Sequence, residues 1–221
     1  MKSKPINCGG TIRTENILKW VEGPDVLDVG CAGHIPKPGS SYWLHGKLRE
    51  KFPSITGIDV NEGNINKLKA LGLDDLFVAS AENFDLNRRF DTIVAGELIE
   101  HLANPGLFLQ ECSEHLKPQG RVVLTTPYAF SLLYIIYAFF KFPKTCENGE
   151  HCSWFCVETL TQIIQRYGYK VEHWEIIEDY ELDNPSFLYR IFAGLMVSIG
   201  RVVIPGRLRK NNLLFVISLK D

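Results

Sequence analysis

The chain has 221 residues, of which 45% are hydrophobic and 23% charged, and its formal net charge is −2. This size and composition predict one domain with a well-buried core. The slight negative charge argues against a nucleic-acid binder, and no apolar run reaches the roughly 20 residues that span a bilayer. The cysteines are irregularly spaced and residues 1–10 do not resemble a signal peptide, which predicts a cytoplasmic protein with reduced thiols.

Hydrophobic periodicity predicts alternating helices and strands over the first 125 residues. The expected helices are residues 11–21, 40–51, 62–71 and 105–116, and the expected strands are residues 26–29, 55–59, 76–79, 91–95 and 121–125. Ser40 or Ser41 is the expected N-cap of the second helix, and residues 117–120 (KPQG) are expected to end the fourth. This order predicts an α/β fold, with a parallel sheet covered by helices on both faces.

The alternation breaks after the fifth strand. Residues 128–142 are almost wholly apolar and rich in Tyr and Phe, and a polar loop follows them. The remaining expected elements are helices at 157–167 and 186–204 and strands at 169–177 and 213–219. We expect a single domain over residues 1–221, with an apolar insertion at about 128–150.

The most informative motif is VLDVGCAG at residues 26–33, followed by ITGIDV at 55–60. Each apolar run ends in an acid, Asp28 or Asp59, and a glycine-rich turn follows the first. A dinucleotide site would need this turn to open directly into a helix, but prolines follow Gly33, so a ligand without a pyrophosphate fits better. A tight turn without any ligand is the structural alternative. The two acids argue against it, because buried acids need hydrogen-bond partners.

These motifs resemble those of the class I S-adenosylmethionine-dependent methyltransferases, as do residues 90–102 (FDTIVAGELIEHL) and 116–127 (LKPQGRVVLTTP). The resemblance covers roughly residues 11–219. It implies a Rossmann-like seven-stranded, mostly parallel sheet whose last strand is antiparallel, with S-adenosylmethionine as cofactor. We predict the following cofactor-binding residues: Asp28, Gly30, Cys31, Ala32, Gly33, His45, Asp59, Val60, Ala81, Glu82, Gly96 and Glu97.

Within this resemblance, Asp28, Gly30, Ala32 and Gly33 would shape the site for the methionine end of the cofactor. Asp59 would bind the ribose, Ala81 and Glu82 the adenine, and Gly96 and Glu97 would line the methyl-transfer channel.

The first motif departs from the family pattern, which has glycine where Ala32 and His34 stand and has no proline-rich insertion. His34, Trp43 and His45 are therefore candidates for holding the methionine end. The alternative for His45 is a histidine on a helix surface.

A second group of residues could activate the acceptor. Glu97, Glu100 and His101 have the i, i+3, i+4 spacing of one helix face, and His151 follows the apolar insertion. Carboxylates and imidazoles could bind Mg²⁺ or Mn²⁺, which would lower the pKa of a substrate hydroxyl. His151 as a general base, with His101 beside it, is a second interpretation, and structural histidines are a third. Cys146, Cys152 and Cys156 lack the C-x₂-C spacing of a structural zinc site.

The combination ELIEHL … EHCSWF resembles two metal-dependent branches of the family. One comprises the O-methyltransferases of ubiquinone biosynthesis, and the other the small-RNA 3′-terminal 2′-O-methyltransferases. Residues 146–150 are acidic, which argues against an RNA substrate.

The apolar run at 128–142 has three interpretations: a core helix over the active site, an acceptor pocket, or an element at a membrane interface. A second apolar segment, 187–204, ends near Arg201, Arg207, Arg209 and Lys210, so residues 128–142 and 187–210 could make peripheral membrane contact.

We therefore predict an S-adenosylmethionine-dependent methyltransferase that methylates oxygen on a small or lipid-linked acceptor, such as a quinone precursor or a glycan sugar. The alternatives are a non-catalytic S-adenosylmethionine-binding module and a metal-dependent RNA 3′-end 2′-O-methyltransferase. The expected location is the cytoplasm, and peripheral association with the membrane is the alternative.

Overall fold

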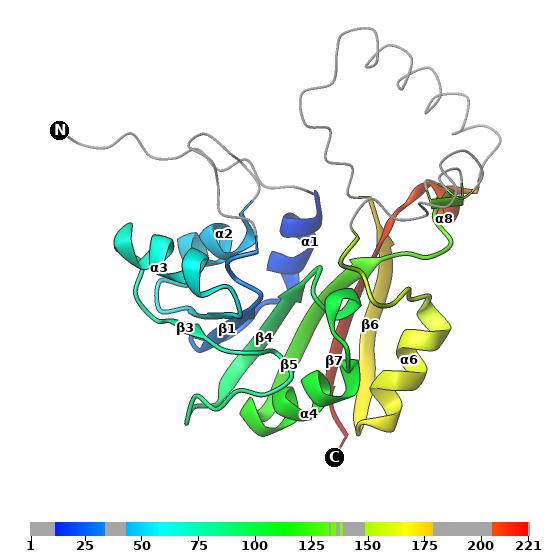
Figure 1. Cartoon of the computed structure of the whole chain (residues 1–221). Helices are drawn as coiled ribbons and strands as arrows, with labels where there is room; N and C mark the ends of the chain where they lie inside the picture. The colour runs from blue at the N-terminus through cyan, green and yellow to red at the C-terminus, as the bar shows by residue number, and fades with distance from the viewer. Residues whose placement is uncertain are drawn as a thin grey trace, which may run out of the picture.

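The computed structural model describes residues 12–33, 43–132, 134–135, 138, 149–178 and 205–220. This part of the chain forms one seven-stranded sheet with strand order β3-β2-β1-β4-β5-β7-β6 (Figure 1). The strands are β1 (Val26–Val29), β2 (Thr56–Asp59), β3 (Leu76–Val78), β4 (Phe90–Gly96), β5 (Leu116–Pro127), β6 (Tyr169–Ile177) and β7 (Asn212–Leu219). Strands β1 to β5 pair in parallel, whereas β7 is antiparallel to both β5 and β6. The predicted Rossmann-like sheet with an antiparallel last strand is confirmed.

Helices cover both faces of this sheet. They are α1 (Ile12–Trp20), α2 (Leu44–Lys51), α3 (Glu62–Ala70), the 3₁₀ turn η1 (Ile99–His101), α4 (Pro105–His115), α6 (Val157–Arg166) and the short α8 (Gly206–Arg209). Neighbouring side chains of β7 contact the helix layers on the two faces of the sheet, because alternate residues of a strand point to opposite faces. Phe215 packs in the cluster that contains Phe108 of α4 and Leu160 of α6, whereas Leu214 packs with Ile17 of α1.

Two local predictions are wrong. Strand β5 begins at Leu116 rather than at residue 121, because Leu116 already pairs with Phe90 and the register shifts before Thr92. Residues 117–120 therefore lie beyond the end of the helix and belong to the strand, where Gln119 takes a positive φ of 66°. Helix α2 begins only at Leu44, with Trp43 at its N-cap, so the predicted serine cap is not used.

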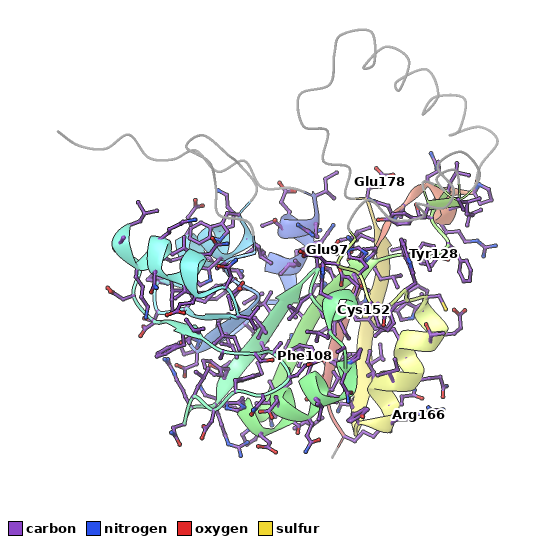
Figure 2. The ribbon with its side chains drawn as sticks, in the orientation of Figure 1. Glu97, Phe108, Tyr128, Cys152, Arg166 and Glu178 are labelled. Atoms are coloured by element: carbon purple, nitrogen blue, oxygen red, sulfur yellow. The ribbon has the colours of Figure 1, made fainter. Side chains whose placement is uncertain are left out.

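The parallel strands carry their carboxyl ends to one edge of the sheet, where sites in open α/β folds are found. Glu97 lies just beyond β4 at this edge, and Figure 2 shows Glu97, Cys152 and Tyr128 toward the same end, whereas Arg166 lies at the opposite end. The loop that contains Cys152 is joined to η1 by backbone hydrogen bonds from Cys152 and Ser153 to the Glu100 carbonyl, at 2.8 and 3.1 Å. The carboxyl edge thus brings together residues from both halves of the sequence.

Several predictions lie outside the described residues. These are His34 and the proline-rich insertion, the helix expected at 186–204, Cys146, Arg201, and seven of the fifteen residues 128–142. Among the residues that the structure describes, no helix is long and apolar enough to cross a membrane.

Candidate functional site

The glycine turn after β1 is held by backbone hydrogen bonds to β2. The N–H groups of Gly30 and Cys31 both donate to the Ile58 carbonyl, at 2.8 and 3.1 Å. Gly30 has a φ of 83°, a conformation that residues with a Cβ rarely adopt. A Cβ at this position would also lie 3.2 Å from Cδ1 of Leu98. Glycine is therefore required here for the chain to turn between β1 and the segment that follows.

The carbonyl groups of the same turn are also held. Nε1 of Trp43 donates to the Cys31 carbonyl and Nδ2 of Asn64 donates to the Ala32 carbonyl, both at 2.9 Å. Burial raises the pKa of the Cys31 thiol, so Cys31 packs as a neutral side chain. Gly33, the last described residue of the turn, is exposed. The turn is thus ordered by the protein itself before any ligand binds.

Asp59 ends β2 beside this turn. Its carboxylate is 7% exposed and accepts the Ala32 N–H at 2.9 Å and the Asn61 N–H at 2.8 Å. Each carboxylate oxygen has more than one acceptor position, so both can still accept a ligand hydroxyl. The next side chain, Val60, is 69% exposed and offers an apolar surface directly beside the acid. A carboxylate next to an apolar surface suits a nucleoside, with hydroxyls at one end and a flat base at the other.

Asp28 is the last residue but one of β1 and is buried, 2% exposed. Its Oδ2 lies 3.0 Å from Nδ1 of His45, which is itself 1% exposed, so the interpretation of His45 as a surface histidine is wrong. Burial raises the pKa of Asp28, whereas the hydrogen bond and charge of His45 oppose that rise, and the charge of Asp59 adds to it. His45 is thus the side chain that compensates for burying this acid.

The residues predicted at the adenine end follow β3. Ala81 is buried, and the Glu82 carboxylate accepts a hydrogen bond from the backbone N–H of Asn104, before α4. Asn104 in turn caps α4, because its side chain accepts hydrogen bonds from the Gly106 and Leu107 N–H groups. Glu82 therefore links the segment after β3 to the start of α4.

Glu97 follows Gly96 at the end of β4 in a left-handed conformation, with a φ of 52°. Its N–H donates to the Thr125 carbonyl at 3.1 Å. Its carboxylate accepts a hydrogen bond from Nδ2 of Asn212 at 2.8 Å and lies 3.6 Å from a guanidinium nitrogen of Arg13. The predicted helical spacing is therefore wrong for Glu97, because the helical turn begins only at Ile99.

Glu100 lies in η1 and is 1% exposed. Oε2 accepts a hydrogen bond from Oγ1 of Thr126 at 2.9 Å, and Oε1 has no hydrogen-bond partner among the described residues. Burial, and next the negative charge of Glu97, raise the pKa of Glu100 from 4.5 to about 8. The isolated carboxyl is therefore neutral at pH 7, with one oxygen free to meet a proton donor or a cation.

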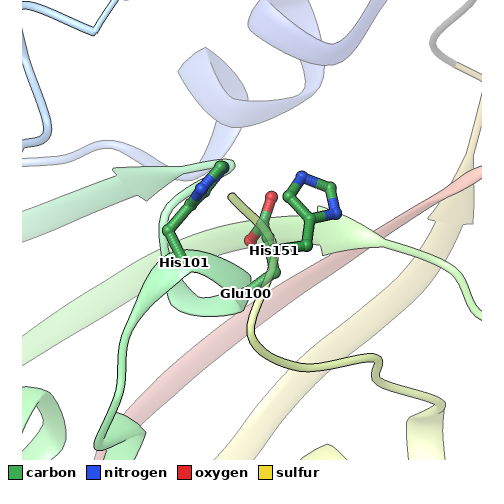
Figure 3. Close-up of side chains that lie close together, drawn as sticks. All are labelled: Glu100, His101 and His151. Atoms are coloured by element: carbon green, nitrogen blue, oxygen red, sulfur yellow. The ribbon is translucent and has the colours of Figure 1, made fainter. Parts of the chain in front are cut away.

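Three of the four predicted metal ligands come together here. Glu100, His101 and His151 each offer a ligand atom, and these atoms lie within 4.8 Å of one another. Figure 3 shows the Glu100 carboxyl between the two imidazole rings in this view. The ring centroids of His101 and His151 are 4.7 Å apart, edge to face. Glu97 does not join this group, nor does any described cysteine.

Aromatic side chains lie beside this group. The His151 ring lies 6.0 Å from that of Trp154, and the Trp154 ring lies 4.7 Å from that of Tyr134, in both cases centroid to centroid. Trp154 is 37% exposed. Tyr134 belongs to the predicted apolar insertion, so the insertion meets the Glu100–His101–His151 group through Trp154.

The pKa of Glu100 leads to a stability prediction. The folded state binds the Glu100 proton up to about pH 8, whereas the unfolded chain loses it near pH 4.5, so stability falls as pH rises between these values. Glu100→Gln should therefore raise the free energy of unfolding at pH 9 by on the order of a few kcal/mol and change it little at pH 5. Denaturant unfolding at both pH values measures this, with exposed Glu114→Gln as control. Equal effects of Glu100→Gln at both pH values would contradict it.

The sequence alone did not reveal the partners of these acids. Arg13, Thr126 and Asn212 hold Glu97 and Glu100 but are distant from them in sequence. A signal exists for Thr126, because Thr125 and Thr126 follow the apolar run 122–124 near the carboxyl end of β5. No comparable signal marks Arg13 or Asn212.

Comparisons with known proteins agree with this geometry. The profile of a family described as a methyltransferase domain matches residues 12–174. The ubiquinone biosynthesis O-methyltransferase of Bradyrhizobium diazoefficiens is 32% identical over 126 residues, which cover 54% of this chain and 46% of that enzyme. The Coxiella burnetii protein of the same name is 26% identical over 184 residues, or 77% of this chain and 74% of that protein. The match thus spans less than half the length of the Bradyrhizobium relative.

A solved S-adenosylmethionine-dependent methyltransferase from Mesorhizobium loti superposes with a TM-score of 0.61 at 17% identity, covering 93% of this chain and 95% of that one. At this identity the likeness concerns the fold. Together with the family match over residues 12–174, it leads to one conclusion. The chain belongs to the methyltransferase-domain family and has the fold of its S-adenosylmethionine-dependent members.

Proposed function

We propose that this methyltransferase uses S-adenosylmethionine to methylate an oxygen of a small or lipid-linked acceptor. The observation that supports the proposal most is the position of the Glu100–His101–His151 group. It lies at the carboxyl edge of the sheet, at the end of β4, whereas the glycine turn and Asp59 lie at the ends of the neighbouring strands β1 and β2. A nucleoside site and a group of proton-transferring side chains therefore share one edge.

The residues of the turn fit the cofactor. Asp59 supplies anionic acceptors for ribose hydroxyls, and Val60 supplies an exposed apolar surface for the base. Gly30 has no side chain, which lets the cofactor approach the backbone closely. Cys31, Ala32 and Gly33 form the neighbouring turn and Asp28 precedes it in β1, and we place the methionine end beside these residues. When bound, S-adenosylmethionine supplies an electrophilic methyl group on a sulfonium, which becomes a neutral thioether after transfer. The role of the protein is to position the acceptor and remove its proton.

His151 is our candidate for removing that proton. Burial, and next the charge of His101, lower the pKa of His151, which keeps its imidazole neutral near pH 7 and able to accept a proton. As the acceptor oxygen bonds to the methyl carbon, the hydroxyl proton passes to an imidazole nitrogen and then to solvent. Glu97 and Glu150 carry charges that oppose the lowering and would stabilise the imidazolium that forms.

A divalent cation is the second arrangement that these side chains support. Glu100, with its unpartnered Oε1, and the imidazoles of His101 and His151 could hold it. One carboxylate with two imidazoles suits Mn²⁺ better than Mg²⁺, which prefers oxygen ligands. Such an ion would supply Lewis acidity, lowering the pKa of an acceptor hydroxyl.

The acceptor is less closely defined by the described residues than the cofactor. The relatives named for ubiquinone biosynthesis favour a hydroxylated quinone precursor over a glycan sugar. Trp154 and Tyr134 beside His151 offer aromatic surface to such a ring. We also propose peripheral membrane contact through residues 128–142 and 187–210, where Phe130 is 54% exposed and α8 carries Arg207 and Arg209.

The test uses radiolabelled S-adenosylmethionine and three acceptors: a short-chain hydroxylated quinone precursor, its long-chain form in anionic vesicles, and a free sugar. We expect label on the quinone precursor, and more on the vesicle-borne form if membrane contact contributes. Cofactor binding without transfer to any acceptor would favour the non-catalytic binding module. Absence of cofactor binding by calorimetry would contradict the proposal altogether.

A further inference from the structure

His45 is a buried imidazole beneath the glycine turn. It lies in the first turn of α2, which begins directly after the proline-rich segment. Its Cε1 would lie 2.9 Å from a Cβ placed on Gly57 of β2, and its Nδ1 lies 3.0 Å from Asp28 of β1. The ring therefore fills the space between the ends of the two strands that carry the cofactor acids, and only a glycine at position 57 leaves room for it.

We propose that His45 is a positioning residue for cofactor binding: its hydrogen bond and its packing fix the orientation of the Asp28 carboxyl group, without His45 itself touching the cofactor. This inference rests on the proposed use of S-adenosylmethionine. It differs from the sequence-based expectation, in which His45 would bind the methionine end directly.

The direction of the hydrogen bond follows from the chemistry of the pair. When Asp28 is ionised its carboxylate can only accept, so in that state Nδ1 of His45 carries the proton and donates it to Oδ2 of Asp28. Both side chains are at least 97% buried, since their exposed side-chain fractions are 1% and 3%. Removing the donor would leave a buried acid without this compensation, and such an acid binds a proton instead.

The surroundings of Asp28 make this donor important. Among the residues that the structure describes, the other ionisable groups that face the pair are Asp59 at the end of β2 and the Cys31 thiol in the turn. Asp59 is an acid, and its charge favours protonation of Asp28. His45 is therefore the described residue whose hydrogen bond opposes the effects of burial and of Asp59 on Asp28.

Trp43, two residues before His45, supports the same turn from the same segment. Its Nε1 donates to the Cys31 carbonyl, and its ring lies 5.4 Å from that of His45. Trp43 and His45 thus hold neighbouring parts of the same site, the Cys31 carbonyl of the turn and the Asp28 side chain of β1.

The experiment titrates S-adenosylmethionine into full-length protein by calorimetry at pH 7 and pH 5.5. His45→Leu removes the donor and keeps an apolar side chain, whereas His45→Asn keeps an N–H donor at the position of Nδ1. Lys47→Ala, on the same helix, is the control. Thermal unfolding of every variant shows separately whether it is folded.

We expect His45→Leu to weaken binding about tenfold at pH 7, because the Asp28 carboxyl group loses the partner that orients it, and more strongly at pH 5.5 as Asp28 binds a proton. His45→Asn should bind within a few-fold of the wild type. If the leucine variant does not fold, His45→Gln, whose amide lies beyond the Nδ1 position, should show the same extra loss at pH 5.5.

Wild-type affinity in His45→Leu at both pH values would overturn the inference. So would a loss that is equal at both pH values and is not restored by asparagine, because that pattern indicates packing alone. The proposed function would be contradicted by a different result, in which the wild type and Lys47→Ala both bind no S-adenosylmethionine. The inference about His45 would then be contradicted as well.

Discussion

Asp59→Asn should weaken S-adenosylmethionine binding by about 100-fold. The substitution keeps the size of the side chain but replaces one anionic oxygen by an NH₂ group. That group must then face the Ala32 or the Asn61 N–H, both of which donate to the carboxylate. Hydrogen bonds to a charged group contribute about 1.5–3 kcal/mol each, so losing the charge and one acceptor costs about 3 kcal/mol, or roughly two orders of magnitude in affinity.

Calorimetric titration at pH 7 measures this effect, and Glu62→Gln is the matched control. Glu62 is exposed in the first turn of α3, only three residues further along the chain, and its loss of charge is the same. Thermal unfolding of both variants separates a weaker site from a less stable turn. An affinity of Asp59→Asn within threefold of the wild type would contradict the assignment of Asp59 to the ribose.

Most of the fold could be predicted because local pattern and tertiary structure agree over β1 to α4. Each buried strand there is a short apolar run, and turn residues such as Gly72 separate it from the next element. The start of β5 could not be predicted. Pro118 and Gly120 normally indicate a turn, but Leu116 pairs with Phe90, and this contact between distant segments extends the strand.

The candidate site was predictable to the extent that each residue lies at or just beyond the carboxyl end of a strand. Asp28, Asp59 and Glu97 were identified in this way, because parallel strands end at a common edge. What each acid contacts was not predictable, because the partner comes from another part of the chain: His45 for Asp28, and Arg13 for Glu97. The sequence gives a residue's position along its own element, whereas its hydrogen bonds depend on how the elements pack.

The second large effect is expected on kcat, when His151, the residue proposed to activate the acceptor, is substituted. His151→Ala should lower kcat for the quinone-precursor acceptor by about 10²- to 10⁴-fold, the range expected when a general base is removed. The Kd for S-adenosylmethionine should stay within a few-fold, because the cofactor residues lie at β1 and β2 while His151 lies in the loop joined to η1. His173→Ala on β6, whose ring stacks on Trp20, is the control and should retain wild-type kcat.

The same assay with a chelator separates the two arrangements of the group. If His151 acts as a base alone, wild-type kcat is unchanged by the chelator and falls at low pH as the imidazole binds a proton, at a pH below the ordinary value for histidine. If a cation is held, the chelator lowers wild-type kcat to the level of His151→Ala, and Mn²⁺ restores it. Glu100→Ala also distinguishes the two arrangements. It removes a ligand if a cation is held, but only a neutral neighbour if His151 acts as a base alone. Full activity in His151→Ala would exclude both, because each arrangement requires this imidazole.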